Sequence, residues 1–288
     1  MALPGEAAGR RVWTFQRGNA LLLLPPGLFL IVFFFWPLLR VVVRSFVEPQ
    51  LGLENYATVF GAGPYLRVLW TTIEVAGLVT LLCLLLAYPL AYFVSRAHGR
   101  RLKLLMIFVL VPLWTSVVIR SFGWMIVFQR QGVLNEALQS LGLTEAPVTF
   151  LPGPLAVYVG MVHIMLPFMI LPLVASMRGI DRTLLRAADV LGAPPYRRFL
   201  EVFLPLSLPG VSAGVALVFM TSLGFFITPA LLGGPRMLMA AVLIEEKANV
   251  QLDWGLACAL ATTLLLITTA IYLLYLKLMR RDASLPVR

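Results

Sequence analysis

Residues 186–210 read RAADVLGAPPYRRFLEVFLPLSLPG, an arginine-rich stretch between two long apolar runs. A short helix is predicted to lead into this stretch, from Asp181 to Leu191. The Asp181 carboxylate can accept from the free N–H groups at the helix start, and Gly192 suits the left-handed residue that often comes after a helix end. The first predicted helix therefore has a signal at both of its ends.

Two prolines, Pro194 and Pro195, separate this helix from the next one. Proline cannot continue a helix because it lacks a backbone N–H, but it fits the first turn of a new one. A second helix is therefore predicted over Tyr196 to Phe203, after which Leu204-Pro205 leads back into an apolar run. Two short helices with a tight bend would form a knob between spanning segments.

The composition of the whole chain sets its class. The 288 residues are 60% hydrophobic and only 12% charged, whereas an ordinary soluble domain is about 25% charged. Apolar runs long enough to cross about 30 Å of hydrocarbon recur along the chain. We therefore predict an all-α membrane protein. The net charge of +10 does not indicate nucleic-acid binding, because the basic residues fall between the apolar runs, where membrane topology explains them.

Six transmembrane helices are predicted, and they divide the chain into a cytoplasmic N-terminal segment (1–20), a membrane domain (21–276) and a cytoplasmic tail (277–288). The first apolar run could be a signal peptide, but no small-residue cleavage site comes after it, so we expect an uncleaved span. The predicted spans are Leu21–Leu39, Val68–Val94, Leu102–Phe128, Leu155–Met177, Leu208–Leu232 and Gly255–Leu276.

The Lys and Arg residues outside the spans predict the orientation. Sixteen of them lie in the N-terminal segment, residues 95–103, residues 178–207 and the tail, against six in the segments on the other side. Cytoplasmic loops carry the excess of Lys and Arg, so both termini and the 178–207 loop are expected in the cytoplasm.

The 178–207 loop resembles the cytoplasmic loop of bacterial ABC-importer permeases, which carries Glu-Ala-Ala, three residues, a glycine, nine residues, then an aliphatic residue, any residue, Leu and Pro. The same spacing holds here for Arg186-Ala187-Ala188, Gly192, Val202 and Leu204-Pro205, with arginine in place of the glutamate. The resemblance implies that the loop inserts into a cleft of a separate ATP-hydrolysing subunit. The candidate coupling residues are Asp181, Arg186, Ala187, Ala188, Gly192, Leu204 and Pro205.

Arginine at position 186 has the opposite charge to the glutamate of the pattern, so an acidic partner is expected for it. We expect Arg186 to pair with Asp189, its i,i+3 neighbour, or with an acidic group on the ATP-hydrolysing subunit.

Other stretches resemble the spermidine/putrescine-type branch of these permeases. They are Pro112–Trp124 with Gly132–Asn135, and Gly224–Pro235 with Asp253-Trp254. Together with the loop, the resemblance covers spans two to six and implies a type I permease-like bundle. Permeases for other small organic solutes share these segments.

The resemblance also implies a function and a set of partners. The chain would be the permease subunit of an ATP-driven importer in the bacterial inner membrane, for putrescine, spermidine or a related amine or amino-acid derivative. Two copies of an ATP-binding subunit, a second permease subunit (identical or different) and a periplasmic or extracellular solute-binding protein would complete it. Transport would proceed by alternating access. No cofactor, metal or nucleic acid is implied.

Two charged residues interrupt predicted spans: Glu74 in the second and Arg120 in the third. An ion within a membrane faces the protein interior or water by default, because exposure to lipid is costly. The pair could line the solute path, bind each other or reach the interface, and for Arg120, which lies within a motif, a structural role is favoured. The candidate path residues are Glu74, Arg120, Trp124, Phe225 and Thr228, with Glu74 the expected contact for a cationic amine.

No motif for nucleotide or metal binding is present. None of Lys103, Lys247 and Lys277 comes directly after a glycine, so the chain lacks the Gly-Lys-Ser/Thr of a P-loop, and the energy is expected from another subunit. His98 and His163 have no second ligand at zinc spacing, and His163 is expected to be a hydrogen-bonded packing group.

The alternative function is a self-contained secondary transporter or channel. Such a protein would need its own coupling groups, and the spans offer only Glu74 and His163. A membrane-embedded enzyme is a third hypothesis, for which no catalytic arrangement is visible in the sequence.

Overall fold

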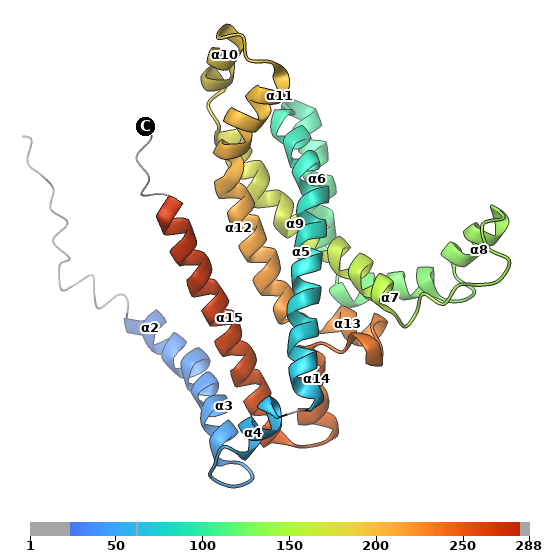
Figure 1. Cartoon of the computed structure of the whole chain (residues 1–288), viewed down its shortest axis with the longest axis vertical. Helices are drawn as coiled ribbons and strands as arrows, with labels where there is room; N and C mark the ends of the chain where they lie inside the picture. The colour runs from blue at the N-terminus through green and yellow to red at the C-terminus, as the bar shows by residue number, and fades with distance from the viewer. Residues whose placement is uncertain (1–23, 62, 283–288) are drawn as a thin grey trace, which may run out of the picture.

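A computed structural model of the chain describes residues 24–61 and 63–282, and every regular element in those ranges is helical (Figure 1). Within them five helices are long and apolar enough to cross a membrane, or six if one bent pair counts as a single span. The predicted all-α, multi-span fold is confirmed. In chain order the elements are α2 (Leu24–Leu30), η1 (Ile31–Phe35), α3 (Trp36–Val47), α4 (Glu54–Phe60), α5 (Pro64–Arg96), α6 (Gly99–Trp114), α7 (Val117–Phe128), α8 (Val133–Ser140), α9 (Pro154–Gly179), α10 (Arg182–Val190), α11 (Pro195–Arg197), η2 (Arg198–Phe203), α12 (Leu204–Leu223), α13 (Ile227–Leu232), η3 (Pro235–Met237), α14 (Ala240–Glu245), η4 (Glu246–Val250) and α15 (Trp254–Asp282).

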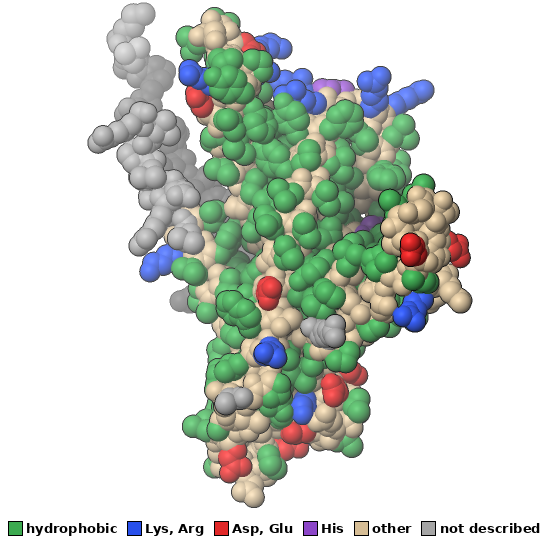
Figure 2. All heavy atoms as spheres, turned by 45° about the vertical axis from the view of Figure 1, so that its right-hand side comes forward, with side chains coloured by type: hydrophobic (Ala, Val, Ile, Leu, Met, Phe, Trp, Pro, Cys, Tyr) green, Lys and Arg blue, Asp and Glu red, His purple; other side chains and the backbone are tan. Residues whose placement is uncertain are grey.

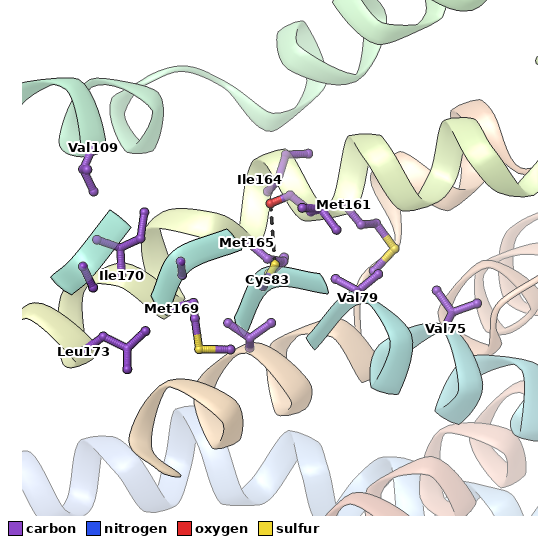
Figure 3. Close-up of a cluster of buried hydrophobic side chains, with 14 of the residues drawn as sticks. Val75, Val79, Cys83, Val109, Met161, Ile164, Met165, Met169, Ile170 and Leu173 are labelled. Carbon is purple, nitrogen blue, oxygen red and sulfur yellow. Dashed lines mark hydrogen bonds between the residues drawn. The ribbon is translucent and has the colours of Figure 1, made fainter. Parts of the chain in front are cut away.

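The core of the bundle is formed by α5, α9 and α12, which pack against one another along their lengths. Methionines of α9, among them Met161, Met165 and Met169, fill the space against Val79 and Cys83 of α5 (Figure 3). Unbranched methionine side chains adapt to the irregular gaps between crossing helices. These buried contacts hold the spans together where lipid supplies no hydrophobic driving force.

The approach of α12 to α9 depends on two glycines one turn apart, Gly210 and Gly214. A Cβ at Gly210 would lie 2.5 Å from Cβ of Ser176, and one at Gly214 would lie 2.6 Å from Sδ of Met169. Small residues spaced by four allow helix backbones to approach closely in membranes. Gly210 and Gly214 therefore fix where α12 crosses α9.

The first span is longer than predicted. The described part runs from Leu24 to Val47, and Leu21–Leu23 of the predicted range lie outside the described residues. The helix continues past Leu39 and includes Arg44, whose guanidinium pairs with Glu48 and lies 4.7 Å from the centroid of the Trp254 ring. This end of α3 packs on α15.

The third predicted span, Leu102–Phe128, is broken and not straight. The α6 helix stops at Trp114 and α7 starts at Val117, and α6 is bent by 94° relative to the segment Val117–Ser140, which comprises α7 and α8. Thr115 helps to end α6, because its Oγ1 donates to the carbonyl of Pro112 at 2.8 Å. This carbonyl lies in the last turn, where carbonyls lack the usual N–H partner four residues further along the helix. The span predicted as one helix is therefore an angled pair.

The fifth predicted span, Leu208–Leu232, is wrong at both ends. Its helix stops at Leu223, and after Gly224 the short helix α13 begins at Ile227. At the other end, the expected separate helix Tyr196–Phe203 joins α12 in one run from Pro195 to Leu223.

Pro205 would normally interrupt such a run, because its ring crowds the carbonyl four residues earlier. The preceding turn, η2, is a wider π-helix, which relieves this crowding and lets the helix continue through Pro205. The other three spans extend beyond their predicted limits, as α5, α9 and α15.

Candidate coupling loop and solute path

The start of α10 is fixed by Asp181, as predicted. Its Oδ1 accepts from the backbone N–H of Thr183 at 2.8 Å. This hydrogen bond, with the charge of Arg186 nearby, holds the pKa of the exposed Asp181 carboxyl below its usual value. Asp181 therefore stays ionised at neutral pH and caps the helix as an anion.

The end of α10 has the predicted left-handed residue. Gly192 has φ of +79°, its N–H donates to the carbonyl of Asp189 at 3.0 Å, and the N–H of Ala193 donates to that of Ala188 at 3.0 Å. These two bonds make the Schellman arrangement of a helix end. The chain can then reverse direction within a few residues.

An ion pair closes the bend, but its partners differ from those predicted. Arg198 of η2 places Nη1 2.6 Å from Oδ1 and 2.7 Å from Oδ2 of Asp189. Asp189 thus faces η2 and not Arg186, so the predicted Arg186–Asp189 pair is wrong. The expectation that Arg186 meets an acidic group of another subunit stays a prediction.

The outer side of the knob carries large apolar side chains. Val190 is 87% exposed and Leu191 is 86% exposed, and Leu184 and Tyr196 are also exposed. Figure 1 shows α10 projecting beyond the ends of the long helices. An exposed apolar patch on a projecting element makes the knob a candidate contact surface.

The remaining candidate coupling residues occupy different environments. Ala187 is exposed, whereas Ala188 is buried within the knob; at the start of α12, Leu204 is half-buried and Pro205 is exposed. Of the two alanines, only Ala187 is thus open to a partner, and Ala188 allows α10 to pack on the bend.

A second group of polar side chains lies where α7, α9 and α13 meet. Ser121 and Thr228 share a hydrogen bond of 2.8 Å between their hydroxyls, and Trp124 Nε1 donates to His163 Nδ1 at 3.1 Å. Gly160 of α9 lets Thr228 approach, since a Cβ at this position would lie 2.8 Å from Cγ2 of Thr228. The structure therefore brings together two of the predicted path residues, Trp124 and Thr228, and His163 is the hydrogen-bonded packing group that we expected.

Sequence reasoning missed Ser121, which binds Thr228 from a position next to Arg120. The Arg120 side chain has Nε and Nη1 buried without a hydrogen-bond partner among the described residues. Phe225 is half-buried at the break after α12 and packs against the core.

Glu74 stands apart from this group. It is exposed on α5 in the single chain. In the described part of the structure the ion pairs are Arg44–Glu48, Arg197–Glu201 and Arg198–Asp189, so Glu74 and Arg120 do not bind each other. Of the possibilities that the sequence left open, mutual pairing is wrong.

The long apolar helices define a multi-pass membrane protein. The chain belongs to the family of binding-protein-dependent transport system inner membrane components, whose profile matches residues 75–281. The predicted membership in the ABC-importer permeases is thereby confirmed, and the family comprises transport subunits, not enzymes.

The similarity to individual proteins covers most of the chain. The spermidine/putrescine transport system permease protein PotB of Haemophilus influenzae is 34% identical over 267 residues, 89% of this chain and 93% of that protein. PotB of Escherichia coli is 34% identical over 254 residues, covering 85% and 92%. The inner membrane ABC transporter permease protein YdcU of Escherichia coli is 31% identical over 282 residues, covering 90% and 89%.

The fold is shared with a solved importer. One chain of a bacterial alginate ABC transporter, in complex with its alginate pentasaccharide-bound periplasmic protein, aligns with a TM-score of 0.77 at 21% identity, over 96% of this chain and 99% of that chain. This likeness supports the permease-like arrangement of the helices.

Proposed function

We propose that the chain is a permease subunit that carries a polyamine, such as putrescine or spermidine, or a related amine, across the inner membrane. The similarity to two PotB permeases at 34% identity over most of the chain supports this substrate class. Glu74 supports it too, because a carboxylate exposed on a spanning helix suits a cationic amine, whereas the charge of Arg120 would repel one.

The energy for transport comes, in this proposal, from two copies of an ATP-binding subunit that engage the knob formed by α10, the bend and η2. The single observation that carries this step is the exposed apolar face around Val190 and Leu191, held on a capped and ion-paired loop. ATP-driven closure of the two subunits would move the knobs and turn the attached spans, giving alternating access. The cytoplasmic placement of the knob and of both termini is part of the proposal.

A second permease subunit and a solute-binding protein complete the assembly. The binding protein would dock on the segment 233–254, which includes α14 and lies at the end of the molecule opposite α10 (Figure 1). Figure 2 supports this orientation, because Lys and Arg gather at the end that carries α10, whereas Asp and Glu lie mainly away from it.

Uptake in cells tests the energy source directly. Radiolabelled putrescine and spermidine are supplied to cells that express the whole importer, and to cells in which only the ATP-binding subunit is deleted. We expect uptake to stop in the deletion strain although the proton gradient is intact. Continued uptake there would support the self-contained transporter instead, and uptake of neither amine by the complete importer would reject the substrate class.

A further inference from the structure

A cleft rich in arginine lies on the inner side of the knob, turned toward the spans. Its volume is about 370 Å³, and five of the residues that line it are arginines: Arg96, Arg178, Arg182, Arg186 and Arg198. They come from the last turns of α5 and α9, from α10 and from η2. We call it the arginine cleft.

The negative charge near the cleft does not balance these cations. Arg198 is the lining arginine with an anionic partner, Asp189, which does not itself line the cleft. Two other arginines have neutral partners: Arg96 lies 4.0 Å from the centroid of the Tyr92 ring, and Arg178 Nη1 donates to the carbonyl of Ala97 at 3.3 Å.

The two arginines of α10 complete the set. Arg182 Nη2 lies 3.0 Å from His98 Nε2, and no carboxylate is within salt-bridge distance of Arg186 in the described part of the chain. The exposed carboxylate of Asp181 interacts with Arg186 only at longer range and is bound to the N–H of Thr183. Several like charges in one cleft repel one another, and an anion that bridges them removes this cost.

The position and the walls of the cleft indicate the kind of anion. The last turns of spanning helices lie where hydrocarbon gives way to lipid headgroups, and Met177, Ile180, Leu185 and Phe203 provide apolar walls beside the arginines. Guanidinium forks match phosphate oxygens in a bidentate manner, and basic pockets at the cytoplasmic side of membrane proteins suit anionic headgroups. We propose that the arginine cleft binds a phosphate group, supplied by the headgroup of an anionic phospholipid.

This proposal explains the charge reversal in the loop. The ABC-importer pattern that the loop resembles has glutamate where this chain has Arg186. A carboxylate at this position would neutralise the neighbouring arginines from within, whereas Arg186 adds a cation and leaves the cleft in need of an external anion. The inference rests on the proposed cytoplasmic placement of the knob, but not on the identity of the solute.

Native mass spectrometry of the detergent-solubilised importer tests the cleft. The complex is titrated with phosphatidylglycerol or with zwitterionic phosphatidylethanolamine. The compared proteins are the parent, the double variant Arg182→Gln/Arg186→Gln, and Arg101→Gln as a control, because Arg101 is an exposed arginine of α6 outside the cleft. We expect the double variant to bind phosphatidylglycerol about twenty-five-fold more weakly, at about fivefold for each arginine removed. The control should bind it like the parent.

Further arms of the experiment separate the alternatives. Inorganic phosphate is added to the lipid-stripped complex, and Arg186→Glu should lower phosphatidylglycerol binding at least as much as Arg186→Gln. If inorganic phosphate alone binds with the same dependence on Arg182 and Arg186 and displaces the lipid, the lipid is not the source. Equal lipid binding by all variants overturns the proposal. If the double variant loses the ATP-binding subunit while its lipid binding is unchanged, the lipid proposal is overturned, and the cleft is instead a binding site for an acidic protein segment. Putrescine uptake, measured in parallel, reports on the proposed function independently.

Discussion

Glu74 is the one carboxylate within the α5 span, and its exposure in the single chain leaves it open to whatever faces α5 in the assembled importer. Arg120, the other intramembrane charge, has buried nitrogens and belongs to the interior of the bundle. The two charges that the sequence grouped together therefore differ in environment. Only Glu74 combines an anionic charge with an open position.

Replacing Glu74 tests its role as the amine contact. We expect Glu74→Gln to lower putrescine uptake roughly tenfold, since a hydrogen bond to a charged group contributes about 1.5 kcal/mol or more. Glu74→Asp, which keeps the charge, should retain part of the activity. Glu54→Gln on α4 serves as the control, because it removes an exposed carboxylate outside the span. Uptake by Glu74→Gln at the parental rate, with equal protein in the membrane, would reject the contact.

Gly192 offers a second test at this scale, through the conformation that ends α10. Its φ of +79° is strained for a residue with a Cβ, by about 1–2 kcal/mol, although a Cβ there would meet no atom within 4 Å. We expect Gly192→Val to uncouple ATP hydrolysis from uptake while the protein stays in the membrane. Gly192→Asn should remain coupled, because asparagine tolerates the left-handed region. The ratio of solute imported to ATP hydrolysed in proteoliposomes distinguishes the two variants, and equal ratios would contradict the prediction.

Both ends of α10 could be predicted from single residues, because a helix cap depends on neighbours only a few positions away. The ion pair from Asp189 to Arg198 could not, because its partners are nine residues apart and meet only once the bend has formed. The predicted Arg186–Asp189 pair relied on helix spacing alone. In the folded loop, the carboxylate instead faces the approaching cation of η2.

At the scale of elements, the contact of α9 with α12 depends on the small residues Gly210 and Gly214. We expect Gly210→Leu to lower the stability of the solubilised protein by at least 1–3 kcal/mol, since even a Cβ would lie 2.5 Å from Ser176 Cβ and 3.0 Å from the Pro172 carbonyl. Gly77→Leu on α5 is the matched control, because a Cβ there meets nothing within 4 Å. Thermal unfolding in detergent measures both variants, and equal melting temperatures would show that α12 does not need this approach.

Hydropathy located the spans but not their breaks. The 94° bend after Trp114 depends on Thr115 and Ser116, two residues whose effect is lost when hydropathy is averaged over a long apolar window. The continuous helix from Pro195 to Leu223 shows the opposite error, a predicted break that is absent. Pro205 predicts a helix boundary, but the π-helical turn before it lets the helix continue. Breaks of this kind depend on how freed carbonyls are satisfied, which neighbouring helices decide.

At the scale of the whole molecule, the orientation in the membrane can be tested by thiol labelling. Cys83 and Cys258 are both buried, so each can be replaced with alanine to give a background without thiols. Leu191→Cys then reports on the knob and Val250→Cys on the opposite end, at positions 86% and 70% exposed. In intact cells with a permeable outer membrane, an impermeant maleimide should label Val250→Cys and spare Leu191→Cys until the inner membrane is opened. The reverse pattern would place the knob outside and remove its proposed contact with the ATP-binding subunits.

The count of Lys and Arg predicts this orientation from the order of the spans alone, and the labelling experiment is its test. The shape of the solute path could not be predicted in the same way. Ser121 and Thr228 are 107 residues apart, and their contact requires α7 to turn back on α9 and α13. The division into residues 1–20, 21–276 and 277–288 also stays a prediction: residues 1–20 lie outside the described residues, and of the tail only 277–282 are described, as the end of α15.

The run from Pro195 to Leu223 is one continuous helix of 29 residues, about 43 Å long, even though it contains the π-helical turn η2 and the prolines Pro205 and Pro209. One end carries the knob, and the other ends at Gly224, next to Phe225 and four residues before Thr228. A break within this helix would absorb a tilt imposed at the knob, whereas a helix that stays continuous and packs on α9 would pass the tilt on to its far end. In the importer proposed above, leverage along one continuous helix would carry the movement of the knob to the break at Gly224, from which the chain continues into α13 and Thr228.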